Sequence, residues 1–177
     1  GDADLFAFRG TAVYDFDDVT SLPLHYFTSQ DRGDTRQYDR VALEDDNPSL
    51  NAGEGNDPYD FYTSEYYSHE IDVSGFSGDF NRQLQSGLNL DVLFALQSSE
   101  RNVSGNGDGT SFPRYQYDFD DDLDQTSLEI RLSDATGGEF DWIAGAFFMN
   151  DSVDFNSNWT SYAVLSQYSS PYNQRRN

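Results

Sequence analysis

The chain has 177 residues, with 32 acidic and 10 basic side chains, a formal net charge of -22 and no cysteine. A charge this negative repels phosphate backbones, so the composition argues against nucleic acid as a partner. Without cysteine there are no disulfides, no thiolate zinc sites and no thiol nucleophiles. Aromatic residues make up 16% of the chain, far more than disordered acidic chains carry, which indicates a folded protein.

Short segments in which apolar and polar residues alternate predict β-strands along the chain. The clearest lies around Leu90, Val92 and Phe94, which alternate with polar residues such as Asp91. No window carries the apolar spacing of an amphipathic helix, so we expect an all-β protein. Pro23 lies in the second segment, where it removes one hydrogen-bond donor from the ladder. The six predicted strands cover residues 5–16, 19–29, 67–76, 87–97, 126–133 and 140–149.

Short and long connections alternate between these segments. The short ones are polar turns at Asp15–Asp18, Ser77–Leu84 and Ser133–Glu139, and the last contains the pair Gly137-Gly138, which suits positive φ. The expected long connections are residues 30–65, residues 98–118 and everything after Asn150. Long structureless connections are uncommon in a compact soluble domain. They are typical of transmembrane β-barrels, which have short periplasmic turns and long outer loops.

Segment length and face pattern favour the same architecture. A barrel strand crosses the hydrocarbon layer in about 9 to 11 tilted residues, with apolar side chains toward lipid and polar ones toward the interior. We therefore expect part of an antiparallel up-and-down transmembrane β-barrel. Six strands cannot close such a barrel, so the chain is expected to be one portion of a larger wall.

Aromatic residues near the ends of the predicted strands are typical of the girdles at membrane interfaces. Ordinary β-propensity explains each of them equally well, so only the set is informative. The set comprises Tyr14, Phe16, Tyr26, Phe27, Tyr66, Tyr67, Tyr117 and Phe119.

Residues 124–148, DQTSLEIRLSDATGGEFDWIAGAFF, contain two strand motifs around a glycine turn. The segment resembles TonB-dependent outer-membrane receptors, in which an S-x-E-x-R-L strand precedes a (F/L)-D-W-x-x-G-x-F-(F/Y) strand. Leu128 stands where that family usually has Gln. The matching residues are Ser127, Glu129, Arg131, Leu132, Gly137, Gly138, Phe140, Asp141, Trp142, Gly145, Phe147 and Phe148.

The resemblance implies a barrel of about 22 strands around a plug, with residence in the bacterial outer membrane and contact with its lipid. It implies TonB-driven import of a small nutrient, such as a siderophore, haem, a vitamin or a glycan. Neither a plug nor a TonB box is visible in this sequence, so we expect the TonB complex to act through a missing N-terminal segment. It also implies that Glu129 and Arg131 face the lumen, either as a cross-strand or plug-facing ion pair or as two solvated charges.

Asp118, Asp120, Asp121, Asp122 and Asp124 form an acidic run that invites a comparison with calcium loops. The glycine expected at the sixth position of such a loop is Leu123, and no helices flank the run, so loose divalent binding at a loop is the better interpretation. The GNGDG stretch at residues 105–109 is expected to be a loop tip.

The sequence offers little for bond chemistry. His25 and His69 are the only histidines, and no serine lies in a nucleophile elbow, so we do not expect an enzyme, a cofactor or a metal centre. Aromatic residues in the expected loops could contact a ligand, although packing within the loops explains them as well. They are Tyr59, Phe61, Tyr62, Tyr115, Trp159, Tyr162 and Tyr168.

Two functions from different classes follow from these patterns. The first is a portion of a TonB-dependent receptor that binds and translocates a nutrient without bond chemistry. The second is a secreted acidic β-sandwich that binds carbohydrate or mediates adhesion, with Ca²⁺ at the Asp-rich loop. The two differ in where the alternating apolar face goes: toward lipid in the first, toward a dry interior in the second.

Overall fold

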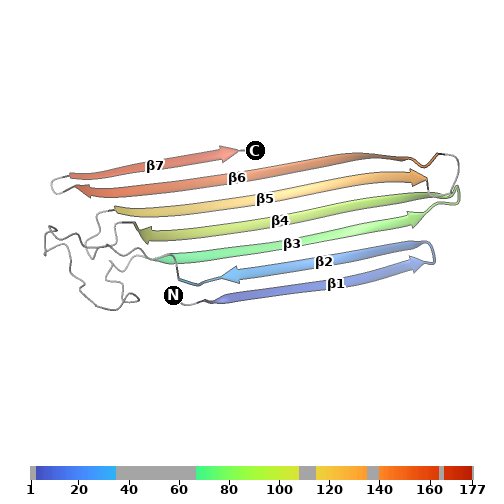
Figure 1. The fold of residues 1–177 in the computed structure, drawn as a ribbon, viewed down its shortest axis with the longest axis horizontal. Helices are drawn as coiled ribbons and strands as arrows, with labels where there is room; N and C mark the ends of the chain where they lie inside the picture. The colour runs from blue at the N-terminus through green and yellow to red at the C-terminus, as the bar shows by residue number, and fades with distance from the viewer. Residues whose placement is uncertain (1–2, 35–66, 108–114, 135–139, 164–165, 177) are drawn as a thin grey trace.

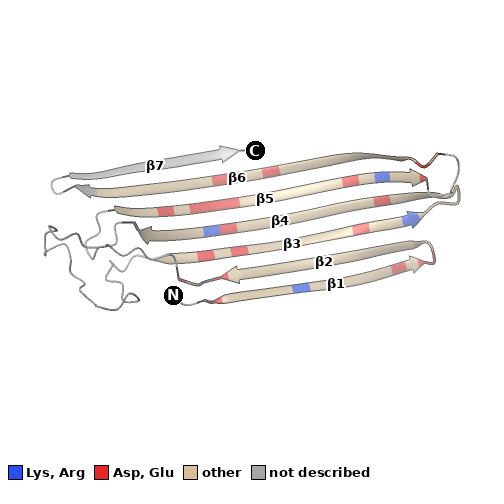
Figure 2. Ribbon diagram, viewed as in Figure 1, with Lys and Arg blue, Asp and Glu red and all other residues tan. Residues whose placement is uncertain are grey.

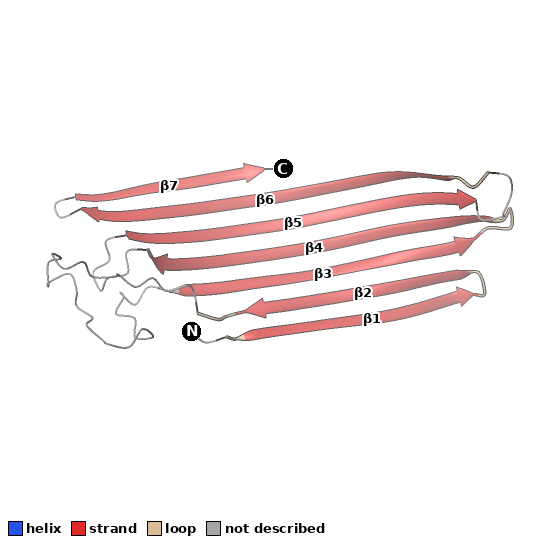
Figure 3. Cartoon of the chain, in the orientation of Figure 1, coloured by secondary structure: helices blue, strands red, loops and turns tan. Residues whose placement is uncertain are grey.

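The computed structural model describes residues 3–34, 67–107, 115–134, 140–163 and 166–176. These residues form one sheet of seven antiparallel strands, each paired with the next along the chain (Figure 1). No helix long and apolar enough to cross a membrane occurs in this part of the chain (Figure 3). The prediction of an all-β, up-and-down antiparallel sheet is confirmed.

The strands are long, and the three longest contain 19, 20 and 21 residues. β1 and β7 form the two edges of the sheet, and no pairing joins them in the part of the chain that is described. The strands are β1 (Leu5–Asp17), β2 (Thr20–Asp31), β3 (Ser68–Gln83), β4 (Leu88–Asn106), β5 (Tyr115–Asp134), β6 (Ile143–Ala163) and β7 (Ser166–Arg176).

Three expected connections differ from the structure. Residues 77–83 belong to β3, so the turn to β4 lies at residues 84–87. Most of the expected loop at 98–118 is strand, because β4 continues to Asn106 and β5 begins at Tyr115. The segment after Asn150 was expected as a long connection but forms the second half of β6 and all of β7, with two residues between them. These segments carry many polar side chains and do not keep apolar residues on a single face, which is the pattern that indicates a strand.

Two turns show how the chain reverses at the end of the sheet that carries the short connections, on the right in Figure 1. After β3, the N–H of Gly87 donates to the carbonyl oxygen of Leu84 at 2.9 Å, and Gly87 adopts a φ of 84°. A side chain rarely tolerates that φ, which explains a glycine here. After β1, the carboxylate of Asp17 accepts from the N–H of Val19 at 3.0 Å. The expected Gly137-Gly138 turn lies outside the described residues.

The pairing register keeps the two faces of the sheet separate from β2 to β6. Every pair there joins two even-numbered or two odd-numbered residues, so even residues share one face and odd residues share the other. β1 follows the same rule up to Asp15, where its register shifts. We call these surfaces the even face and the odd face.

The even face carries an apolar band next to the short turns. One row across β3 to β6 contains Phe80, Val92, Ile130 and Ala146, and the rows beside it contain Phe94, Leu128, Phe148, Leu90, Leu132 and Ala144. Along β4 the band runs from Leu88 to Leu96. That length corresponds to the about 9 to 11 residues of a tilted strand that crosses a bilayer.

No hydrophobic side chain in the described part of the chain is buried. Large apolar residues of the band are open instead: Phe148 is 60% exposed and Ile130 44% exposed. A soluble sheet normally packs one face against a second layer, and the described residues supply no such layer. The core that these side chains require therefore lies outside this sheet.

Beyond the band, the polarity of the two faces reverses. On the even face of β5, Leu128 and Thr126 are followed by Asp124, Asp122 and Asp120, and Figure 2 shows this acidic stretch on the strand. On the odd face, aromatic and aliphatic residues replace polar ones. Ile71 and Val73 of β3 consequently lie on the odd face, opposite to the band.

Candidate functional site

Glu129 and Arg131 both lie on the odd face of β5, at the level of the apolar band. They bind each other within the strand, because the guanidinium of Arg131 donates from Nε to Glu129 Oε1 at 2.6 Å and from Nη2 to Oε2 at 2.8 Å. Asp91 of β4 stands directly opposite Arg131, and Gly145 of β6 is its partner on the other side. The expected charges are thus a bidentate pair along one strand, with a third charge across from it.

The five aspartates from Asp118 to Asp124 lie in β5 and not in a loop. The prediction of an Asp-rich loop was therefore wrong. Strand geometry separates their side chains: Asp121 points to the odd face and the other four to the even face. No group of three or more potential metal ligands occurs in the described part of the chain. Carboxylates spaced along an extended strand lie too far apart to converge on one ion.

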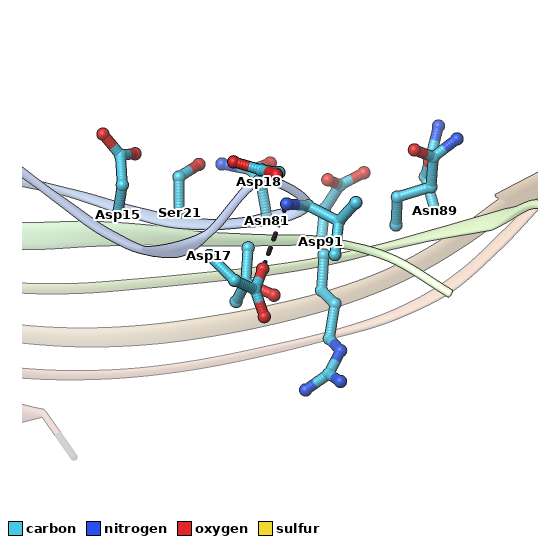
Figure 4. Close-up of a pocket in the computed structure, with 11 residues that line it drawn as sticks. Asp15, Asp17, Asp18, Ser21, Asn81, Asn89 and Asp91 are labelled. Carbon is cyan, nitrogen blue, oxygen red and sulfur yellow. Dashed lines mark hydrogen bonds between the residues drawn. The ribbon is translucent and has the colours of Figure 1, made fainter. Parts of the chain in front are cut away.

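A second polar group lies at the turn end, in a hollow beside the β1–β2 turn (Figure 4). Asp15, Asn81 and Asp91 point to one side of the sheet there, and Asp17 points to the other. Side-chain bonding by Thr20 and backbone bonding by Val19 keep the pKa of Asp17 below its usual value. Asp15, Asp17 and Asn81 were expected in polar turns, and Asp91 was expected in the strand at residues 87–97.

Aromatic side chains gather at the opposite end of the odd face. Trp159 of β6 is central, with ring centroids at 5.3 Å from Phe119, 5.4 Å from Tyr115 and 5.9 Å from Tyr117. Phe155 extends the group, at 6.4 Å from Phe119. We call Tyr115, Tyr117, Phe119, Phe155 and Trp159 the aromatic cluster. Offset and edge-on arrangements at these separations are favourable for aromatic rings.

Gly105 of β4 and Gly107, just after the strand, make room for two of these rings. A Cβ atom on Gly105 would lie 2.5 Å from the hydroxyl oxygen of Tyr117, and one on Gly107 would lie 2.7 Å from the ring of Tyr115. The tyrosine rings therefore lie over the backbone of the neighbouring strand. Glycine opposite an aromatic residue is a known way to hold a ring flat against a sheet. The expected GNGDG loop tip thus begins as part of β4 and as the support for this cluster.

The aromatic cluster borders a hollow of about 940 Å³ on the odd face. Ile71 and Val103 add aliphatic surface, and Arg101, His69 and Asp34 add polar groups. Arg101 forms an ion pair with Asp121 on the facing strand. This combination of ring faces and a few polar groups is typical of sites for small molecules.

Contacts between polar side chains order the strand ends near the hollow. His69 Nε2 lies 3.4 Å from Asp31 Oδ2. The N–H of Gly33 donates to the same carboxylate, and this bond, helped by His69, keeps the pKa of Asp31 below its usual value. On the even face, Arg32 donates to Asp72 at 2.5 Å, which raises the pKa of Arg32. The other histidine, His25, lies apart from this group and contacts Thr11 at 3.1 Å.

Sequence reasoning found part of this site. Tyr115 and Trp159 were expected in loops as possible ligand contacts, and the structure brings them together in paired strands. Tyr117 and Phe119 were expected as interface anchors, but they lie on the odd face well beyond the apolar band. The signal that could have found them is the alternation of aromatic and polar residues in 115–119 and 153–159. Tyr59, Phe61, Tyr62 and Tyr66, and the side chains of Tyr162 and Tyr168, lie outside the described residues.

Comparison with protein-family models, with curated proteins and with solved structures found no match for this chain.

Proposed function

We propose that this chain forms part of the barrel wall of a TonB-dependent receptor in the bacterial outer membrane. In this proposal the even face contacts lipid, the odd face lines the lumen, and the protein imports a small nutrient without bond chemistry. The observation that carries the proposal is the exposed apolar band on one face of a single-layer sheet, in which none of the hydrophobic side chains that the structure describes is buried. Such a face requires an apolar surrounding, and hydrocarbon supplies it.

Three further features support the proposal. The band has the length of a membrane crossing, and β4 to β6 continue well past it, away from the β1–β2 and β3–β4 turns, as expected of strands that project from the outer leaflet. On β4 and β5, polar and charged residues such as Glu129, Arg131 and Asp91 lie on the odd face beside the band. The segment 124–148, which resembles the receptor family, forms parts of β5 and β6.

The alternative is a secreted β-sandwich, which would cover the band with a second sheet. The described residues form one sheet, so the second sheet would have to come from elsewhere. The alternative also placed calcium in an Asp-rich loop, whereas these aspartates lie along β5. The receptor proposal therefore accounts for more of the structure.

Single cysteines can test where each face points, because this chain contains none of its own. Leu128→Cys and Ser127→Cys place a fluorophore at neighbouring positions on opposite faces, and Asp122→Cys places one on the even face beyond the band. The intact protein in bilayers should show quenching by nitroxide-labelled lipid at Leu128→Cys but not at Ser127→Cys. Asp122→Cys should react with a water-soluble maleimide.

A sandwich would give a different pattern, because Leu128→Cys would be unreactive and beyond the reach of the lipid quencher. The receptor assignment itself is tested by binding of the purified C-terminal domain of TonB to the intact protein. Lipid quenching without TonB binding would leave a membrane barrel but would contradict an importer of this kind.

A further inference from the structure

The aromatic hollow on the odd face has the chemistry of a ligand site. Tyr115, Tyr117, Phe119 and Trp159 come from two neighbouring strands, and their ring centroids lie within 6 Å of at least one other ring. Gly105 and Gly107 let the tyrosine rings lie over the sheet. The result is a group of ring faces held in place before any ligand arrives. Preorganised rings bind well because little side-chain freedom remains to be lost.

The charges around the hollow disfavour an anionic ligand. Arg101 is the one guanidinium that lines the hollow among the described residues, and Asp121 already occupies it in an ion pair. Asp31 and Asp34 add negative charge close by. An anion would have to displace Asp121 and approach carboxylates, which costs electrostatic free energy.

The same groups fit hydroxyls better than a cation. A cationic ligand would gain from the ring faces and carboxylates but offers no acceptor for the N–H groups of Arg101. The pairs Arg101–Asp121 and His69–Asp31 offer both donors and acceptors. Hydroxyl groups both donate and accept hydrogen bonds, so they satisfy such a mixed rim. A ligand without them would leave buried polar groups unpaired.

We propose that the aromatic hollow binds a neutral carbohydrate chain, whose C–H ring faces stack on Trp159 and Tyr117 while its hydroxyls meet Arg101, Asp121 and His69. The C–H bonds of a sugar ring present weakly positive hydrogens, and these suit the negative faces of aromatic rings. The hollow, about 940 Å³, is at the upper end of the range for small-molecule pockets, so it accommodates more than one ring. This inference rests on the proposed function and names the nutrient class for the odd face.

Binding is measured by titration calorimetry on the intact protein in nanodiscs. The probes are maltohexaose, cellohexaose and xylohexaose, with a galacturonate hexamer as the anionic counterpart and choline as the cationic one. At least one neutral hexaose should bind at millimolar or lower concentration. The galacturonate hexamer should bind more weakly than that hexaose because of Asp31 and Asp121. Choline should bind more weakly than that hexaose because of Arg101.

Variants show whether binding uses the aromatic hollow. Trp159→Ala should weaken binding of the hexaose by about tenfold or more, and Trp159→Phe should retain most of the affinity because a ring remains. Gly105→Ala should also weaken binding, because its Cβ displaces the Tyr117 ring without removing it. Trp142→Phe is the matched control, since Trp142 lies at the opposite end of the sheet and should leave affinity unchanged.

The proposal is overturned if none of the neutral hexaoses binds, if choline or the uronate binds more tightly, or if Trp159→Ala binds as well as the parent. These results are separable from the membrane test. Lipid quenching at Leu128→Cys without hexaose binding refutes only the carbohydrate inference. Hexaose binding that depends on Trp159, without lipid quenching, refutes the receptor and leaves the carbohydrate site standing.

Discussion

Asp122 of β5 lies directly opposite Glu100 of β4 on the even face. The same row continues to Asp154 on β6 and to Asp72 on β3, so four carboxylates cross four strands in line. Like charges at opposed positions of a sheet destabilise it. Arg32 compensates one end of the row through its bond to Asp72. The row lies just past the apolar band, where an aqueous surrounding screens the repulsion.

Asp122→Asn should therefore stabilise the protein, by about 0.5 kcal/mol in the free energy of unfolding, because it removes repulsion from both sides. The gain should shrink as salt is added. Asp120→Asn is the matched control on the same face, since its opposed partners are Asn102 and Asn156. Urea unfolding at low and high ionic strength measures both variants, and equal effects of the two would contradict the repulsive row.

Leu128→Arg should destabilise the protein in a bilayer by about 2 to 4 kcal/mol, since it places a charge on the proposed lipid face near the middle of the band. Ser127→Arg changes the neighbouring residue to the same side chain but points to the odd face, so its cost should be small. Reversible unfolding from lipid vesicles gives the two values. Similar costs for both variants would mean that the even face does not contact lipid.

Gly145→Ala should destabilise β6, because its Cβ would lie 2.7 Å from the backbone oxygen of Ile130. A backbone atom in a paired strand cannot move aside as a side chain can, and we expect a loss of about 1 to 3 kcal/mol. Gly10→Ala serves as the control, since its nearest contact would be the ring of Phe8 at an ordinary 3.5 Å. The difference in thermal unfolding midpoints measures the effect, and a harmless Gly145→Ala would show that the two strands can separate there.

Arg131→Gln should destabilise the protein more than Glu129→Gln. Without Arg131, the carboxylates of Glu129 and Asp91 remain on the same face with no guanidinium between them. Without Glu129, Arg131 keeps Asp91 and Asp79 as attractive neighbours. Denaturant midpoints for the two variants should differ in that order, and the reverse order would show that Arg131 is not the charge that holds this group together.

The parts of the fold that alternation predicted are those in which apolar residues keep to one face. Residues 87–97 and 126–133 were identified because Leu90, Val92, Leu128 and Ile130 stand out against polar neighbours, and the structure has strand at 88–97 and 126–133. The outer halves of the same strands were missed. There the even face is acidic and the apolar side chains lie on the odd face. Polar and apolar residues therefore still alternate, but with the two faces exchanged. The run from Asp118 to Asp124 therefore resembled a loop.

The candidate site could not be predicted from the pattern of residue types alone, because it also depends on the pairing register of the strands. Trp159 and Tyr117 are 42 positions apart in sequence, and only the pairing of β5 with β6 makes them opposed residues. Sequence reasoning could mark both as aromatic but could not bring them to one hollow. Likewise Glu129 and Arg131 were expected to face the same way, yet their bidentate bond within one strand depends on side-chain rotamers.

By itself, the sequence determined that the chain is all-β, strongly acidic and apolar on alternate residues in short segments, because side-chain period is a local property of an extended backbone. Tertiary structure decided which residues lie opposite one another, that the apolar band is left without a core, and that aromatic rings meet over Gly105 and Gly107. Strand pairing joins positions far apart in sequence, so its register follows from the combined fit of all strands and not from any one of them.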